Sequence, residues 1–70
     1  MLTPILAAEL QPGDQIDDHG ITLTVASAVE TDWVNGGGRR HHGIEAITRQ
    51  RGPVYPLHYA LAEIVQVNRP

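Results

Sequence analysis

The segment Ile21–Arg51 constrains the fold more than any other part of the chain, because it has the pattern of one long β-hairpin. Its centre is Asn35-Gly36-Gly37-Gly38, a run of residues that favours a chain reversal. Two adjacent glycines accept the positive φ angles of a type I′ turn, so we place Gly36 and Gly37 at the centre of the turn. This choice fixes the register of the two flanking strands.

The register gives the hairpin one apolar and one polar face, since side chains alternate along a strand. Trp33 then faces Arg40 at the tip. A shift of one strand by one residue would mix the two faces and bury Glu30, although the pattern leaves a β-bulge open. The remaining members of the predicted apolar face are Thr31 with His42, Val29 with Ile44, Ser27 with Ala46, Val25 with Thr48, and also Ile21 and Leu23.

The N-terminal segment allows two local structures. We expect a short strand near Ile5–Ala8, and a helical turn with Thr3 as N-cap and Pro4 in its first position is the alternative. The segment then runs into Gln11-Pro12-Gly13-Asp14, which suits a type II turn because proline and glycine occupy the two central positions.

A second strand is predicted at Asp14–Asp18, before a tight turn at His19-Gly20. This turn pairs Ile16 with Leu23. Ile16 therefore joins the apolar face that the long hairpin defines independently, and this agreement favours a β-meander.

Beyond the hairpin, Gly52-Pro53 indicates another reversal, followed by a strand at Val54–His58. With Arg51 opposite the first residue of this strand, Leu57 falls on the apolar face. Pro56 lacks an N–H group, which suits an edge strand or a bulge.

The last part of the chain is expected to contain a single helical or 3₁₀ turn at Ala60–Ala62 and a final strand at Ile64–Val67. A longer helix over His58–Gln66 is the alternative, because the apolar residues there also have helix-like spacing.

Short strands, tight turns and one short helical or 3₁₀ turn before the last strand predict a small all-β antiparallel barrel of about five strands, in a single domain spanning residues 1–70. The chain resembles SH3-like barrels in Ala8–Ile16, in its long hairpin and in the turn before Ile64–Val67. It is also similar to small proteins of actinobacteria and their phages that begin with a leucine-x-proline-glycine-aspartate turn, here Leu10–Asp14. An SH3-like fold implies binding more often than catalysis.

Composition narrows the class of protein further. The chain has 70 residues, no cysteine and a net charge of −3 at pH 7. These values disfavour a disulfide-stapled secreted fold, a thiolate metal site and non-specific binding of nucleic acid by the whole surface. There is no apolar run of membrane-spanning length and no signal-peptide pattern, so we expect a cytoplasmic protein that does not enter a membrane.

The residues that carry chemistry give little support to catalysis or metal binding. Ser27 has no evident base, and Gly36-Gly37-Gly38 precedes a strand, whereas a phosphate-binding loop precedes a helix. His41 and His42 are neighbours on a strand, so they point to opposite faces and are poorly placed to share an ion. We expect no enzyme activity, no metal and no cofactor.

The hairpin tip is the predicted contact surface. Trp33 opposite Arg40 predicts a cation–π pair, and tryptophan and arginine are enriched in binding hot spots. The predicted partner-binding residues are Trp33, Arg39, Arg40 and His42, with Tyr55 and Tyr59 in addition.

A second candidate surface is an apolar stripe on the outer face of the hairpin, where Ala26 is expected to face Ile47. Such a stripe would serve as an interface between copies of the chain. Its predicted residues are Ala26, Ala28, Ile47 and Val54.

Together these features predict a non-catalytic module that binds a protein partner, and the resemblance implies a phage-encoded accessory protein directed at a host or virion protein. Two alternatives stay open. One is an accessory nucleic-acid-binding protein that uses the hairpin arginines, whose field Glu30, Asp32 and Glu45 dilute. The other is a structural subunit of a homo-oligomer, held together by the outer stripe.

Overall fold

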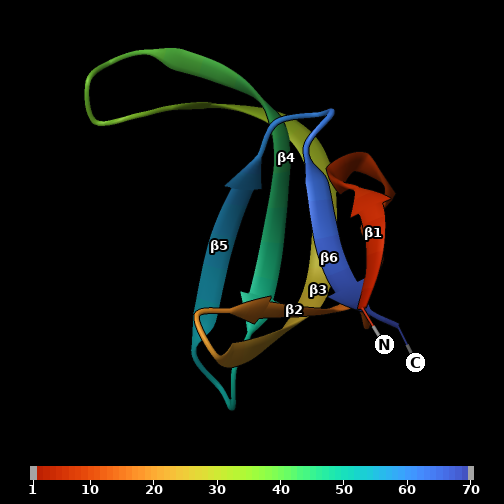
Figure 1. Ribbon diagram of the computed structural model, residues 1–70. Helices are drawn as coiled ribbons and strands as arrows, with labels where there is room; N and C mark the ends of the chain where they lie inside the picture. Colours follow the sequence, from red (N-terminus) through yellow and green to blue (C-terminus); the bar gives the residue numbers. More distant parts are fainter. Residues whose placement is uncertain (1, 70) are drawn as a thin grey trace.

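A computed structural model describes residues 2–69, which form one antiparallel sheet (Figure 1). The strand order is β1-β6-β2-β3-β4-β5, so β1 and β5 are the two edges of the sheet. The elements are β1 (Leu2–Leu6), the 3₁₀ turn η1 (Ala7–Glu9), β2 (Gln15–Asp18), β3 (Ile21–Val34), β4 (Arg40–Arg49), β5 (Val54–Tyr59) and β6 (Ile64–Asn68). The all-β antiparallel prediction is confirmed, with six strands where about five were expected.

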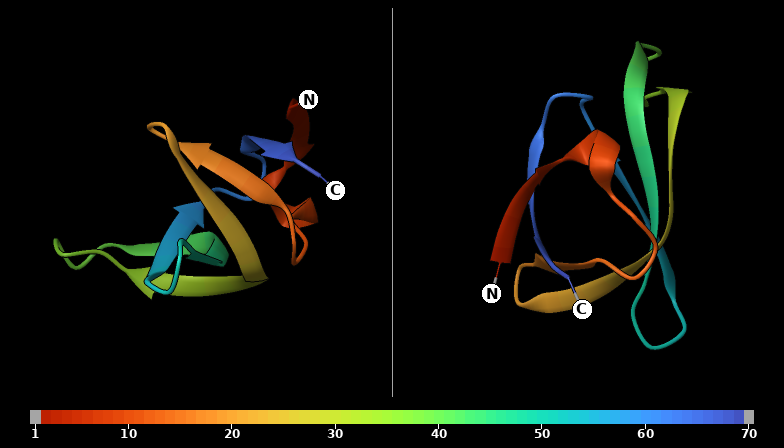
Figure 2. Two further views of the ribbon diagram at one scale, coloured as in Figure 1. Left: turned by 90° about the horizontal axis from the view of Figure 1, so that it is seen from below. Right: turned by 90° about the vertical axis from the view of Figure 1, so that its right-hand side faces the viewer.

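The sheet is curled but open. Figure 2 shows it wrapping around an interior, with the two ends of the chain close together. Within residues 2–69 no ladder joins β1 to β5, so strand pairing does not close the sheet into a barrel. The concave face holds the core, which consists of Ile5, Ala7, Leu10, Ile16, Leu23, Val25, Ile44, Ala46, Val65 and Val67. No helix in this part of the chain is long and apolar enough to cross a membrane.

The turn between β2 and β3 has the predicted geometry. His19 and Gly20 both have positive φ, 52° and 83°, as a two-residue turn of type I′ requires. Ile16 pairs with Leu23 and both are buried, so this register is confirmed.

The long hairpin of β3 and β4 contains a β-bulge that corrects the predicted register. Val25 pairs with Thr48 as expected, but Ser27 pairs with Ile47, so Ala26 is the extra residue. Beyond Ala26 every predicted pair is therefore wrong by one residue.

The bulge also exchanges the two faces of β3 beyond Ala26, whereas β4 keeps the faces predicted for it. Val29, predicted to be in the core, is 52% exposed, whereas Ala28 packs against the core. Glu30 lies on the same side as Ala28 but is exposed, because the end of the hairpin projects beyond the rest of the sheet (Figure 1). We call residues 29–43 the hairpin arm. Ile21, also predicted on the core face, is 44% exposed.

The strand after the hairpin lies on the predicted face in a different register. Val54 pairs with Arg49, whereas Arg51 had been expected, because the connecting loop takes in Gln50 to Pro53. A shift of two residues keeps each side chain on its face, so Leu57 still packs against the core. Pro56 does lie in an edge strand, as its missing N–H indicated.

Both terminal segments differ from the predictions. At the N-terminus the strand expected near Ile5–Ala8 is β1 at Leu2–Leu6, and the helical turn with Thr3 as N-cap is wrong because Thr3 and Pro4 lie in this strand. The 3₁₀ turn η1 follows at Ala7–Glu9. Before the last strand there is no 3₁₀ turn; a β-turn closed by the Glu63 N–H to Ala60 carbonyl bond (3.1 Å) stands there. The longer helix over His58–Gln66 is wrong, because β5 and β6 occupy most of it. Met1 and Pro70, which belong to the predicted domain, lie outside the described residues.

A buried carboxylate ties the C-terminal end of the chain to the Pro-Gly-Asp turn. The Asp14 side chain is 4% exposed and accepts an Arg69 Nε–H bond at 3.0 Å. Asp14 also accepts the Gln11 N–H at 2.9 Å, while Arg69 Nη2 donates to the Glu9 carbonyl at 3.0 Å. These bonds hold η1, the turn and the end of β6 together.

We predict that Asp14→Ala lowers the free energy of unfolding by about 2–4 kcal/mol, because it removes the acceptor of the Gln11 N–H and of the Arg69 Nε–H. Asp17→Ala, at an exposed position of β2, is expected to change it by no more than about 0.5 kcal/mol. Urea unfolding followed by circular dichroism measures both. Equal midpoints for the two variants would show that the Asp14 contacts do not stabilise the fold.

Candidate functional site

The hairpin arm ends in a rigid turn organised by Asn35. Its side-chain Oδ1 accepts the N–H groups of Gly37 (2.9 Å) and Arg39 (3.0 Å), and its N–H donates to the Arg39 carbonyl at 3.0 Å. Gly38 has φ of 81°, the position of a G1 bulge after a type I turn. The loop therefore has three residues and not the predicted two, so Trp33 pairs with His41 and Val34 with Arg40.

Trp33 forms the centre of an aromatic cluster on the outer face of the sheet. Its ring stacks on His41 with centroids 5.8 Å apart and an interplanar angle of 17°. It also contacts His58 of β5, with centroids 4.4 Å apart and an angle of 32°. We call Trp33, His41 and His58 the Trp33 surface.

Hydrogen bonds fix both histidines of this surface. Because Asn35 Oδ1 accepts two backbone N–H groups, its Nδ2 faces His41 and donates to Nε2 at 3.0 Å. His58 Nε2 donates to Glu45 Oε2 at 3.0 Å. The Trp33 ring thus lies against two imidazoles whose orientations are set before any partner arrives.

Gly43 gives the Trp33 ring its place over β4. It is buried, and a Cβ atom at this position would lie 3.0 Å from Trp33 Cη2 and 2.1 Å from the Tyr59 carbonyl oxygen. A glycine is therefore required both for the ring to pack and for β5 to approach β4.

The predicted tip residues divide between two faces of the arm. Trp33 is on the outer face, whereas Arg40 and His42 alternate onto the opposite face. The expected cation–π pair of Trp33 and Arg40 is therefore wrong. Arg39 and Arg40 are both exposed.

His42 is bound between two carboxylates on the opposite face. Its Nδ1 lies 2.5 Å from Asp32 Oδ1, and its Nε2 lies 2.8 Å from Glu30 Oε2. Only the imidazolium form can donate to both oxygens, since a neutral ring has a single N–H. The hydrogen bond to Asp32, and then the one to Glu30, raise the pKa of His42 above its ordinary value of 6.5.

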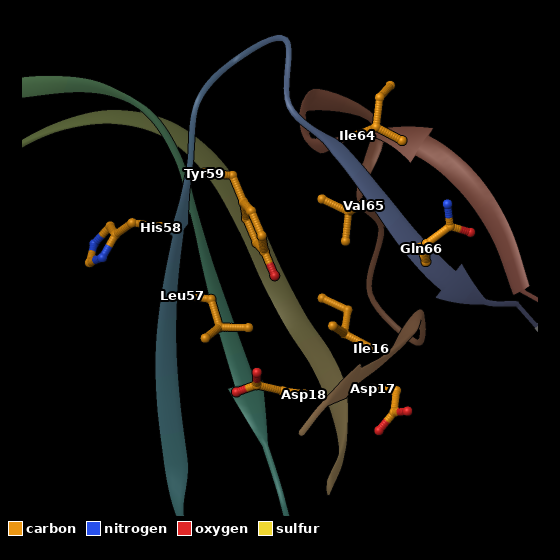
Figure 3. Close-up of a pocket in the computed structure, with 9 residues that line it drawn as sticks. All are labelled: Ile16, Asp17, Asp18, Leu57, His58, Tyr59, Ile64, Val65 and Gln66. Carbon is orange, nitrogen blue, oxygen red and sulfur yellow. The ribbon is translucent and has the colours of Figure 1, made fainter. Parts of the chain in front are cut away.

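The two predicted tyrosines are on β5, and their side chains face the interior of the curled sheet. Tyr55 is 42% exposed and Tyr59 is half-buried. Tyr59 lines an open cleft of about 390 Å³ between β5 on one side and β2 and β6 on the other (Figure 3). We call it the seam cleft. Burial raises the pKa of the Tyr59 phenol, and the charges of Glu63 and Asp18 raise it further.

The predicted interface stripe is not one surface. Ala26 is exposed at the bulge, and Ala28 packs against the core on the concave side. Ile47 and Val54 do lie on the outer face, where Ile47 is half-buried and Val54 is 51% exposed. The bulge separates the members of the stripe because it reverses the face of the β3 residues beyond Ala26 and leaves those of β4 and β5 unchanged.

The arginines do not form a single basic patch. Arg39 and Arg40 are at the end of the arm, and Arg69 is bound to Asp14. Arg49 and Arg51 line a separate open hollow of about 380 Å³ beside Thr22 and Thr24, at the other end of the hairpin.

Comparisons with protein-family models, curated proteins and solved structures returned no match for this chain. Within residues 2–69 no group of three or more histidine, cysteine or carboxylate side chains is arranged to hold a metal ion.

The sequence prediction missed His41, His58, Gly43, Asn35 and Glu45 as members of the site. The sequence does contain a pattern that predicts the turn. In Asn35-x-x-Gly38, asparagine at the first position and glycine at the last are typical of a type I turn with a G1 bulge. That turn alone would have paired Trp33 with His41. The contribution of His58 depends on the register between β4 and β5, for which the loop gives no local signal.

We predict that Gly43→Ala lowers the free energy of unfolding by about 1–3 kcal/mol, because the new Cβ would force the Tyr59 carbonyl away from β4. Gly36→Ala is the matched control, since a Cβ there meets nothing within 4 Å and its φ is not positive. Thermal unfolding of both variants, with near-ultraviolet circular dichroism of Trp33, measures the effect. An unchanged Trp33 signal in Gly43→Ala would contradict the packing that we describe.

The pH dependence of the arm follows from His42. Because its folded pKa is raised, its ion pairs stabilise the fold fully below the unfolded pKa of about 6.5 and lose this effect as the pH rises through the folded pKa. We predict that an NMR titration gives His42 a pKa above 6.5, and that Asp32→Asn with Glu30→Gln lowers it. A His42 pKa that is the same in wild type and in the double variant would refute the clamp.

Proposed function

We propose that this chain is a non-catalytic protein-interaction module, a curled sheet of the SH3-like kind that docks through the Trp33 surface. The observation that carries the proposal is a tryptophan held in a fixed position on a projecting arm. Its neighbours His41 and His58 are each hydrogen-bonded. Aromatic residues in fixed positions bind with little loss of side-chain entropy, and tryptophan is among the most enriched residues at binding hot spots.

The surroundings of Trp33 favour a protein partner. Val29, on the same outer face, is 52% exposed, and Ile47 extends the apolar area toward β5. Polar side chains lie among these residues, since Thr31 stands between Trp33 and Val29 on β3 and Glu45 stands next before Ile47 on the same face of β4. An exposed aromatic residue with both apolar and polar neighbours is typical of a protein interface. The resemblance to phage proteins makes a host or virion protein the expected partner in this proposal.

The chemistry of the arm supports binding and not catalysis. Both ring nitrogens of His42 are bonded to carboxylates, so neither is free to act as a general base. One nitrogen of His41 and one of His58 are similarly occupied.

Affinity capture tests the proposal. Three versions of the chain are immobilised, namely wild type, Trp33→Ala and Val34→Ala, and the partner protein that each one retains is compared. Val34 is the matched control because it is the adjacent residue, 61% exposed, on the opposite face of the arm. We expect Trp33→Ala to lose a hot-spot contact of about 2 kcal/mol or more, roughly thirtyfold in affinity, and Val34→Ala to keep the partner.

The same experiment separates the alternatives. Equal recovery by Trp33→Ala and wild type would contradict docking through the Trp33 surface. Recovery that disappears in high salt and after nuclease treatment would favour the nucleic-acid alternative, since phosphate contacts weaken steeply with salt. Sedimentation velocity without any partner tests self-association, and a defined oligomer would favour the structural subunit.

A further inference from the structure

The seam cleft lies where the sheet fails to close, between two free strand edges. Strand β5 pairs with β4 alone, so its other edge is free. Strand β6 pairs with β2 only through Val67 and Asn68. Residues 64–66 of β6 therefore pair with β1 on one side, and no strand within residues 2–69 pairs with them on the other. The cleft is lined by consecutive residues of each strand, Leu57 to Tyr59 and Ile64 to Gln66. Because side chains alternate, consecutive lining residues show that the cleft runs along the strand edges.

The side chains of the cleft suit an extended chain. Leu57 and Tyr59 point from β5 into the cleft, and His58 points away (Figure 3). Ile16 and Val65 lie opposite them. A second hollow of about 160 Å³ continues along β5 past Leu57 to Tyr55, with Ile21 on its other side. Apolar side chains at every second residue of β5 match the two-residue period of a bound strand.

The cleft carries negative charge, which favours a positively charged occupant. Asp17 and Asp18 line it, and Asp18 also lines the second hollow. Neither lining contains an arginine or lysine, and His58 is bonded to Glu45 on the outer face. A segment with a positive charge therefore complements this surface.

A second copy of this chain does not fit the requirement. The edge strands of the sheet are β1, which has no charged residue, and β5, which has no arginine or lysine. The arm also has free edges, but Arg40 is there accompanied by the carboxylates Glu30 and Asp32. Pairing two β5 edges would also bring two acidic clefts together, and like charges across an interface oppose binding. The occupant that this charge pattern favours is therefore a segment of another protein.

We propose that the seam cleft binds an extended peptide segment of a partner protein, which adds a strand to the free edge of β5 and places an arginine or lysine beside Asp18. The segment is short, because Pro56 lacks an N–H and interrupts the ladder on this strand. Its alternate side chains enter the cleft between Tyr59 and Ile16. This site is separate from the Trp33 surface and does not depend on that surface being used.

A displayed library of random peptides of about ten residues, the usual upper length of a strand, tests the proposal against the folded wild-type chain. We expect enrichment of sequences in which apolar residues alternate and at least one arginine or lysine is present. Chemical shifts of the ¹⁵N-labelled protein should change in residues 54–59 and 64–66 when a selected peptide binds. A library that yields no enriched peptide, or acidic ones, would overturn the proposal.

Variants and modified peptides test the individual contacts. Asp18→Asn should weaken a selected basic peptide by roughly two- to fivefold, as expected for a partly exposed ion pair. Asp32→Asn, the same change of charge on the arm, should leave its affinity unchanged. Methylation of alternate backbone nitrogens of the peptide should abolish binding if a strand is added. Full binding by the methylated peptide would exclude strand addition, and shift changes confined to Trp33, His41 and His58 would place the site on the Trp33 surface instead.

Discussion

The β-bulge at Ala26 is the constraint on which the rest of the architecture depends. Before it, Val25 exchanges hydrogen bonds with the turn, donating its N–H to the Asp14 carbonyl and accepting from the Gly13 N–H, each at 2.8 Å. After it, β3 pairs with β4 alone and extends into the arm. One strand can serve both parts because the extra residue bends it and increases its twist. Without this bend, the arm could not leave the curled sheet while Val25 and Leu23 stay buried.

The bulge also explains which parts of the fold could be predicted from sequence. The turn at His19-Gly20 was predictable and set the pairing of Ile16 with Leu23, whereas the three successive glycines at the hairpin tip allowed more than one turn type. Alternation predicted half of the core, namely Ile16, Leu23, Val25, Ile44 and Ala46. It failed at Val29, because alanine and serine near the bulge are tolerated on either face and give no sign of a change in register.

The candidate site was harder to predict than the core for a related reason. Trp33 could be singled out by residue type, but its neighbours depend on two registers, that of the arm and that of β5. A register difference of one residue at the tip made His41 the partner of Trp33, where Arg40 had been predicted. A difference of two residues in the β4–β5 ladder left the faces intact, so Leu57 was placed on the correct side of the strand although its predicted partner was wrong. A register error of an even number of residues leaves each side chain on its predicted face, whereas an error of an odd number moves it to the opposite face.

Strand β5 joins the two surfaces that we assign to binding. His58 contacts Trp33 on the outer face, whereas Leu57 and Tyr59 enter the seam cleft. Because the positions of all three depend on the ladder with β4, a displacement of β5 would alter both surfaces at once. Gly43 lies at the end of this ladder, and its lack of a Cβ atom leaves room for the Tyr59 carbonyl on one side and the Trp33 ring on the other. The glycine that allows Trp33 to pack is thus also the residue that holds one side of the cleft in place.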